Sequence, residues 1–473
     1  MAEILPWFST HRGGWGVVFT PLRDEPLPRR ELLRRTAAGG VAVSVGALLA
    51  ACGANKAAAP TTTVPKTVVT FSPYRGTVSK TVQALYDQVL DQFNSQNKTI
   101  EVRLTPILQG NYSGTIASIL AGNAPDVFED YDSTPYTEAG YLLDISGYLK
   151  GHDMSIFNAS TISHFTVGGK IYAMPVSIES MVTAVNLSLL DTAGVALPPQ
   201  NWTVEQAQSV YETLAKPATT SEPAHYGGAI YFLSGYPVPM YLHGYGATYV
   251  DPTNATMCAL GATKAIDCGT YLFGLLSTNV CNQLIGSSTA DFAAATLGTT
   301  LCGSWMIPQF LNVPAGVDWD FYPMPAGPVG SFTYGSAAMY GIPTTTKHAE
   351  EAWAFLEWIT FEPNLQNALI QMFLLPPATI PLYDNWVSLV KTYAPPLAKK
   401  NLGTFQSSVA NSVVPAEFTY NSTDAFALVA QGMSEILKSQ AAVPEVFTAT
   451  ASQVDTYEQS QAQQASHTSA ANN

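Results

Sequence analysis

Four of the five cysteines of this 473-residue chain lie between positions 258 and 302. Clustered cysteines in an oxidising compartment usually form disulfides, and the CxxC-type spacing of a metal site is absent. We therefore expect two disulfides among Cys258, Cys268, Cys281 and Cys302. Pairing of neighbours, 258 with 268 and 281 with 302, is preferred among the three possible arrangements. Free buried thiols are the main alternative, and a metal site is the weaker one.

The fifth cysteine, Cys52, follows a basic and then an apolar segment. Residues 28–34 read PRRELLR, residues 36–51 are weakly apolar, and the run ends in LAAC at positions 49–52. This order resembles a twin-arginine export signal joined to the lipobox of bacterial lipoproteins, in which a lipid is attached to the cysteine. A short buried helix is the alternative. We interpret residues 1–51 as a signal peptide, Cys52 as the lipidation site and residues 52–65 as a flexible tether, which places the protein on the outer face of the cytoplasmic membrane.

Composition excludes several classes of protein. Hydrophobic residues make up 47% of the chain and charged residues only 12%, which is too apolar for a disordered chain. The formal net charge of −14 would repel nucleic acid. No HxxxH pair, GxSxG elbow or Gly-rich phosphate loop occurs. We expect no cofactor, no metal and no catalytic residue, although two carboxylates of a glycosidase could still meet in space.

The folded part begins with an alternation of strands and helices. Residues 68–71 are rich in β-formers, apolar residues recur at helical spacing over 78–93, and residues 100–104 alternate as a strand. A helix over 112–121 and a strand over 126–128 follow. This order predicts a parallel α/β sheet, whose ligands bind at the carboxyl ends of the strands. Farther on, residues 350–361 predict a helix, and the polar segment 460–473 predicts a disordered tail.

Eight short motifs, in order, resemble those of extracellular solute-binding protein family 1, the sugar-binding proteins of ABC importers. They are GNAPDVF (122–128), GYLLDI (140–145), GKIYAMP (169–175), Asn186 with WTVE (202–205), GSW (303–305), PMPAG (323–327), YG (334–335) and the helix 350–361. The resemblance covers residues 66–455, although Val185 and Leu301-Cys302 depart from the residues usual at their positions.

The resemblance implies an α/β fold of the type II periplasmic-binding-protein class, with two lobes joined by a multi-crossing hinge. Residues 66–176 and 326–385 would form lobe one, and residues 181–322 and 386–458 lobe two. The crossings would lie at 176–180, 323–325 and 384–386. All four clustered cysteines would then belong to lobe two, where no disulfide could lock the hinge.

A sugar site needs polar side chains for the hydroxyl groups and aromatic rings for the C–H faces. The candidates are polar or aromatic residues in loops of the implied fold, where core burial and helix capping are the competing explanations. They are Tyr74, Arg75, Glu129, Asp130, Asp132, Glu179, Tyr231, Tyr236, Trp305, Tyr334 and Gly335. Less favoured are Tyr131, His243, Tyr245 and Trp386.

The resemblance implies a lipoprotein that captures a sugar or oligosaccharide and delivers it to the permease subunits of an ABC importer. We expect a monomer that does not bind nucleic acid. A secreted carbohydrate-active enzyme or an adhesin is the alternative. The sequence does not identify the sugar, but the scarcity of Lys and Arg disfavours an anionic ligand.

Overall fold

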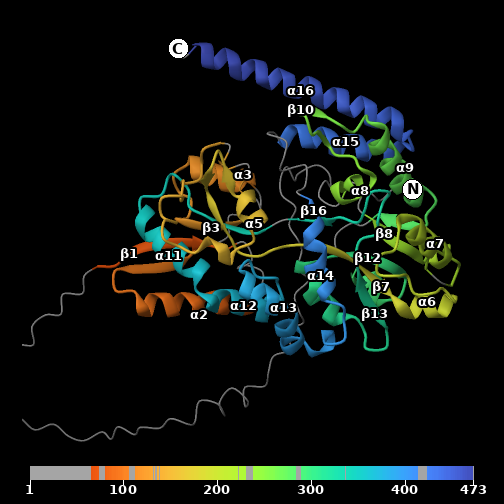
Figure 1. The fold of residues 1–473 in the computed structure, drawn as a ribbon, viewed down its shortest axis with the longest axis horizontal. Coiled ribbons are helices and arrows are strands. Elements are labelled where there is room, and N and C mark those ends of the chain that lie inside the picture. Colours follow the sequence, from red (N-terminus) through yellow and green to blue (C-terminus); the bar gives the residue numbers. More distant parts are fainter. Residues whose placement is uncertain are drawn as a thin grey trace, which may run out of the picture.

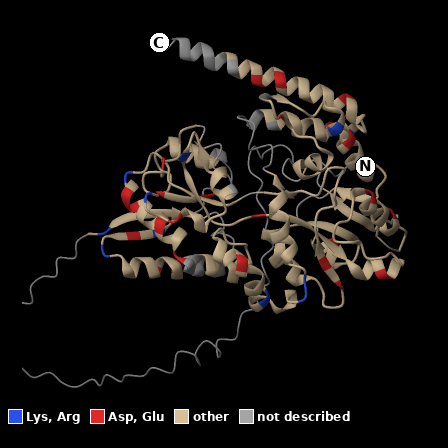
Figure 2. Ribbon diagram, viewed as in Figure 1, with Lys and Arg blue, Asp and Glu red and all other residues tan. Residues whose placement is uncertain are grey.

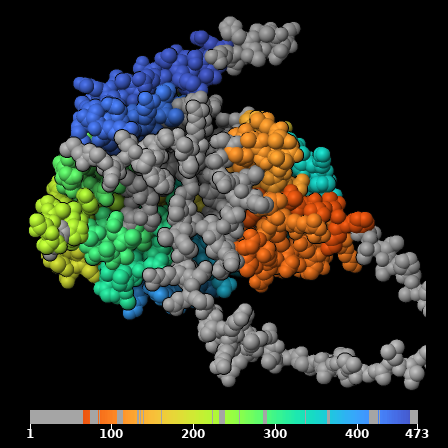
Figure 3. Space-filling model, turned by 180° about the vertical axis from the view of Figure 1, so that it is seen from behind, coloured from red at the N-terminus to blue at the C-terminus, as the bar shows by residue number. Residues whose placement is uncertain are grey.

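The computed structural model describes residues 65–73, 80–105, 112–130, 133, 136–137, 139–221, 223–230, 238–283, 289–335, 337–413 and 423–471. These residues form two α/β lobes side by side, each built on a five-stranded sheet (Figure 1). Seen from behind, the last helix runs along the top of lobe two (Figure 3). The expected signal peptide, Cys52 and the tether up to residue 64 lie outside the described residues.

Lobe one is built on a mixed sheet of order β2-β1-β3-β15-β6. The first three strands are parallel, as the strand–helix alternation predicts, and β15 runs antiparallel to both β3 and β6. The elements are β1 (Thr67–Ser72), α2 (Lys80–Gln96), β2 (Ile100–Leu104), α3 (Tyr112–Leu120), β3 (Val127–Asp130), η1 (Met154–Ile156), α5 (Ala159–His164), β4 (Thr166–Val167), β5 (Lys170–Ile171), β6 (Ala173–Pro175), β15 (Met339–Gly341), α11 (Ala349–Phe361) and α12 (Pro363–Phe373).

The core of lobe one forms because α2 and α11 each turn one apolar face toward the sheet. Tyr86 and Phe93 of α2 and Phe355 of α11 are buried against Phe71 of β1. The ring centroids of Phe71 and Phe355 lie 5.2 Å apart in an edge-to-face contact. The predicted elements over 68–71, 78–93, 100–104, 112–121, 126–128 and 350–361 are confirmed to within three residues at each end.

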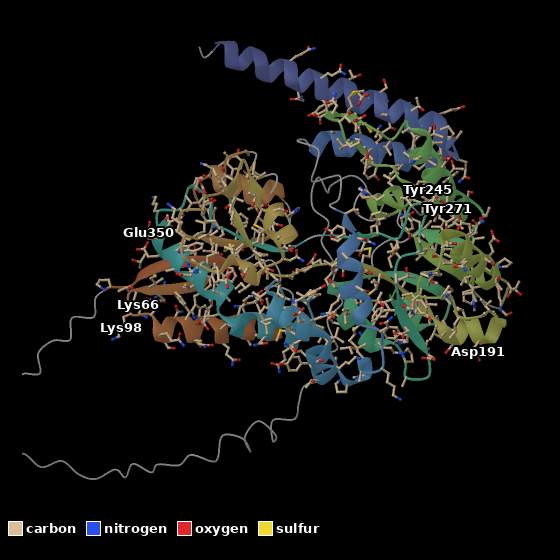
Figure 4. The ribbon with its side chains drawn as sticks, viewed as in Figure 1. Lys66, Lys98, Asp191, Tyr245, Tyr271 and Glu350 are labelled. Atoms are coloured by element: carbon tan, nitrogen blue, oxygen red, sulfur yellow. The ribbon has the colours of Figure 1, made fainter. Side chains whose placement is uncertain are left out.

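The outer end of lobe one, remote from lobe two, is where β1 begins. The ammonium group of Lys66 donates to the carbonyl oxygens of Asn94 at 2.8 Å and Asn97 at 2.6 Å, at the carboxyl end of α2. A cation suits this end of a helix because the last carbonyl groups carry partial negative charge. Lys98 lies at the same end of the lobe (Figure 4). The chain that precedes Lys66 therefore joins lobe one on the side opposite to lobe two.

Lobe two is built on a sheet of order β11-β8-β12-β7-β13. Strands β8, β11 and β12 are parallel to one another, and β7 runs antiparallel to β12 and β13. The elements are β7 (Met181–Asn186), α6 (Leu187–Ala193), α7 (Val204–Leu214), β8 (Tyr226–Ile230), α8 (Val238–Tyr245), β9 (Val250–Asp251), β10 (Asn254–Cys258), α9 (Thr263–Ser277), β11 (Cys281–Gln283), α10 (Thr289–Ala293), β12 (Leu297–Gly303), η2 (Ser304–Asn312), β13 (Trp319–Tyr322), β14 (Thr333–Tyr334), α13 (Ile380–Tyr393), η3 (Pro395–Leu397), α14 (Gly403–Ser408), η4 (Val409–Asn411), β16 (Ser412–Val413), α15 (Thr423–Ser439) and α16 (Val443–Ala471).

Helix α16 corrects the expectation of a disordered tail after residue 460. The helix packs Val443, Phe447 and Val454 into the core of lobe two, and it continues to Ala471. Its last turns contain mostly Ala, Gln and Ser, with neither Gly nor Pro, so nothing in the backbone stops a helix that tertiary packing has already nucleated.

Three chain segments join the two lobes, and two of them differ from the expected crossings. Residues 176–180 cross as expected. The second crossing lies at 335–338, because residues 326–334 stay on lobe two: Ala326 bonds to the backbone of Trp202, and Gly335 to that of Val413. The third precedes α13, since Pro376 and Pro377 pair with the first crossing, whereas Trp386 is buried in the core of lobe two.

The four clustered cysteines are free, which corrects the expected disulfides. Each comes from a different element of lobe two, and each is at most 8% exposed. Cys281 lies opposite Gly228 in β8, and Cys302 lies opposite Val182 in β7, so the strand pairing does not set these two thiols against each other. Spacing along the chain could not show this. The thiols fill the core as small apolar groups, and burial raises the pKa of Cys268, Cys281 and Cys302.

This arrangement makes the four thiols unreactive in the folded protein and reactive after unfolding. Alkylation requires the thiolate, which burial disfavours. Without any reductant, iodoacetamide should leave Cys258, Cys268, Cys281 and Cys302 unlabelled in the native protein and label all four in guanidinium chloride, as read by peptide mass mapping. Peptides linked by a disulfide after labelling in denaturant would contradict the free-thiol arrangement.

Candidate functional site

The hinge brings together the sheet ends of both lobes. In lobe one, Met339 of β15 lies opposite both Asp130, the last residue of β3, and Pro175, the last residue of β6. The first crossing follows Pro175 directly, and the N–H of Val176 donates to the carbonyl of Ala338 in the second crossing at 2.7 Å. The carboxyl end of β3 is therefore one strand away from the hinge, the edge at which parallel α/β sheets bind ligands.

Two predicted carboxylates occupy this end of β3. Glu129 is 4% exposed and Asp130 is 6% exposed. The Tyr86 hydroxyl donates to Glu129 Oε2 at 3.2 Å, and the Tyr136 hydroxyl donates to Asp130 Oδ2 at 2.6 Å. Buried carboxylates need such donors to offset the loss of hydration. These bonds fix the positions of both carboxylates at the edge of lobe one that is nearest the hinge.

The third predicted carboxylate, Glu179, lies in the first crossing itself. Its side chain is buried, and the Ser177 hydroxyl lies 3.5 Å from Glu179 Oε1. The adjoining residue is tied to lobe two, because the N–H of Ser304 donates to the carbonyl of Ser180 at 2.9 Å. This bond extends the ladder in which Met181 of β7 lies opposite Gly303 of β12. Glu179 precedes Ser180, and Trp305 follows Ser304 at the start of η2, so this bond brings the two chain segments together at the hinge.

Trp305 depends on the glycine two residues before it. A Cβ atom added to Gly303 would lie 2.4 to 2.6 Å from atoms of the Trp305 indole, so the ring lies directly over the end of β12. The indole is half-buried and meets the Tyr334 ring edge-to-face, with 5.7 Å between centroids. The two predicted aromatic residues thus form one cluster at the start of the second crossing.

Gly335 has a packing role in this cluster. Its N–H donates to the carbonyl of Val413 at 2.9 Å, and a Cβ at this position would lie 2.6 Å from Ser412 Cβ. The close approach of the two chains requires glycine here and holds Tyr334 in β14 against β16.

The remaining predictions fall elsewhere. The following candidates lie outside the described residues: Tyr74, Arg75, Tyr131, Asp132, Tyr231 and Tyr236. The less favoured Tyr245 packs near Tyr271 in lobe two, with ring centroids 6.0 Å apart (Figure 4). His243 packs near Phe332, and partial burial lowers its pKa. The indole N–H of Trp386 donates to the Leu374 carbonyl inside the core, so this ring serves packing.

Sequence reasoning singled out Trp305 but not the groups that position it. Gly303 and Ser304 adjoin it in the sequence, and both were part of a recognised motif. Their roles depend on the register of β7 and β12, which no local pattern reveals. Among the described residues, no three side chains of the metal-binding types come together, and no helix is long and apolar enough to span a membrane.

Acidic side chains outnumber basic ones on the ribbons of both lobes (Figure 2). Two α/β lobes with buried carboxylates and an aromatic pair beside a three-segment hinge define a receptor of the type II periplasmic-binding class. Over residues 77–365 the sequence matches the family described as bacterial extracellular solute-binding protein, and the chain belongs to that family.

Individual relatives are distant. An uncharacterized lipoprotein of Streptomyces antibioticus is 22% identical over 320 residues, which are 63% of this chain and 68% of that protein. The maltodextrin-binding protein MdxE of Bacillus subtilis is 32% identical over 152 residues, which are 31% of this chain and 33% of that protein. An ABC substrate-binding protein from Listeria monocytogenes, solved in complex with cycloalternan, is 19% identical with a TM-score of 0.71, covering 83% of this chain and 99% of its own. This last likeness shows the fold.

The contact between Gly303 and Trp305 can be tested by a double-mutant cycle. Gly303 has φ −73° and ψ 149°, which alanine adopts freely, so the cost of Gly303→Ala should come from the displaced indole alone. We expect Gly303→Ala to lower the free energy of unfolding by about 1–3 kcal/mol in the wild type. In a Trp305→Ala background the same change should cost less than ~0.5 kcal/mol. Equal costs in both backgrounds, measured by urea denaturation, would disprove the contact.

Proposed function

We propose that this protein is the substrate-binding lipoprotein of an ABC importer and captures a sugar or oligosaccharide between its lobes. The observation that carries this proposal is the backbone bond from Ser304 to Ser180, which joins the segment that holds Trp305 to the crossing that holds Glu179. A carboxylate accepts hydrogen bonds from sugar hydroxyl groups, and an aromatic face packs on the C–H groups of the ring.

The neighbouring groups supply the same chemistry from both lobes. Glu129 and Asp130 would contribute acceptors from lobe one, and Tyr334 would add a second aromatic ring from lobe two. The five candidates outside the described residues, Tyr74, Arg75, Asp132, Tyr231 and Tyr236, complete the proposed set. Relatives named for binding maltodextrin and cycloalternan support a carbohydrate ligand.

Capture would follow from the hinge. A ligand that touches both lobes binds the closed arrangement better than the open one, and this difference in affinity shifts the population toward closure. The closed form would then deliver its ligand to the permease. Binding and release need no chemical change in the ligand, in keeping with a protein that is not an enzyme.

A thermal-shift screen over mono- and oligosaccharides tests the ligand class. A sugar present at 100 times its Kd should raise the stability of the folded protein by about 2.7 kcal/mol, and the melting temperature should rise accordingly. Trp305→Ala should weaken binding of that sugar roughly tenfold, about 1.4 kcal/mol.

Trp358→Ala is the matched control. Trp358 is also a half-buried tryptophan, but it packs on Phe93 at the outer side of lobe one, 5.2 Å between ring centroids. The Trp358→Ala substitution should leave the affinity for the sugar unchanged. If no sugar raises the melting temperature, the carbohydrate assignment fails while membership of the family stands; equal losses in both variants would remove Trp305 from the site.

Anchoring through Cys52 is tested separately. A lipoprotein carries its acyl chains on this cysteine, and two or more chains hold a protein stably on a membrane. Cys52→Ser should therefore move the protein from the membrane fraction to the soluble fraction, as followed by immunoblot of fractionated cells. The same substitution at the buried Cys302 should leave it with the membrane. Retention of the Cys52→Ser protein in the membrane fraction would rule out the lipid anchor.

A further inference from the structure

A pocket of about 270 Å³ lies in lobe two, apart from the hinge. It opens where the carboxyl ends of α9 and α15 meet β11, which is the edge strand of the lobe-two sheet. None of the residues that line it belongs to a crossing segment or to the candidate sugar site. The proposed sugar-binding function therefore leaves this pocket unexplained.

Side-chain amides dominate its polar lining. Asn279, Asn282, Gln283 and Gln440 all contribute to the wall. The side-chain amides of Asn279, Asn282 and Gln440 make no hydrogen bond to any other part of the chain that the structure describes. Their donors and acceptors are therefore available to a ligand. Each amide offers both a donor and an acceptor, which matches the hydroxyl group of a ligand.

The backbone holds two of these amides in fixed positions. Asn279 has φ 57° and Gln440 has φ 56°, and both lie directly after the last turn of a helix. The left-handed conformation redirects the chain there and turns both residues toward β11. Two helix ends and one strand edge thus define the wall, so the pocket is not the product of a single loop.

The electrostatics favour a neutral ligand. No Asp, Glu, Lys, Arg or His is among the described residues that line the pocket. Two helices end there, and their terminal carbonyl groups carry partial negative charge, which disfavours phosphate or carboxylate. Phe273 and Leu437 supply apolar surface beside the amides, a combination suited to a ring that carries hydroxyl groups on its rim and C–H groups on its face.

We propose that this pocket is a second binding site, for a neutral polyhydroxylated molecule no larger than a monosaccharide. Its volume lies just below the roughly 300–1,000 Å³ typical of pockets for drug-sized ligands. The site is independent of the cleft, because the lining groups all belong to lobe two and their positions do not depend on closure.

Hydrogen-exchange mass spectrometry with D-glucose and myo-inositol as probes locates binding along the chain. Either probe should slow exchange in peptides that cover residues 273–283 and 435–441. Ser277→Phe, at an exposed position in the pocket wall, should abolish this protection by filling the space, and Asn282→Leu should reduce it. The control is Ser209→Phe, the same substitution at an exposed position of α7 in the same lobe, which should leave the protection unchanged.

The outcomes distinguish the two sites. Protection confined to the crossings at 176–180 and 335–338 would report binding in the cleft and would overturn the pocket proposal. Protection of the pocket peptides that persists in Ser277→Phe would overturn it as well, as would the absence of any change with either probe up to its solubility. Conversely, protection of the pocket peptides in Trp305→Ala would establish the second site even if the cleft binds no sugar.

Discussion

The antiparallel pairing of β7 with β12 is the contact on which both the hinge and the candidate site depend. Five residue pairs hold the two strands in the middle of the lobe-two sheet, and the bond from Ser304 to Ser180 carries the pairing into the first crossing. The same ladder therefore fixes where lobe two ends and where the first crossing begins. A shift of this pairing by one residue would turn the side chains of β7 to the opposite face of the sheet, because successive side chains of a strand point to opposite faces.

Around this ladder, side-chain hydroxyl groups make hydrogen bonds to the backbone that other backbone groups make elsewhere in the sheet. The Thr333 hydroxyl lies 2.7 Å from the N–H and 2.6 Å from the carbonyl of Met181, and the Ser180 hydroxyl donates to the carbonyl of Phe405 at 3.1 Å. These buried bonds tie the lobe-two ends of the crossings together. Between these tied ends and lobe one, the first crossing spans residues 176–180 and the second follows Gly335.

Sequence reasoning succeeded where local pattern decides the structure. The elements of lobe one have clear periodicity, from the alternation of residues 100–104 to the apolar face of α11, and the ordered motifs led to the family. It failed where distant segments decide. Residues 333–334 stay on lobe two because they pair with residues 412–413, a partner no local pattern indicates. The cysteines are close in sequence, but each comes from a different element of lobe two. The tail is helical because α15 and β10 support its beginning.

The position of β1 also determines how lobe one responds to mechanical load. The strand enters the fold at Lys66, runs toward lobe two, and is flanked on both sides, by β2 over five residue pairs and by β3 at its far end. A pull on the preceding chain acts along the strand axis and loads these hydrogen bonds together, in shear, instead of opening them one at a time. The bonds from Lys66 to the end of α2 spread the same force to a helix. The pairing of β1 thus lets lobe one resist tension applied at its outer end.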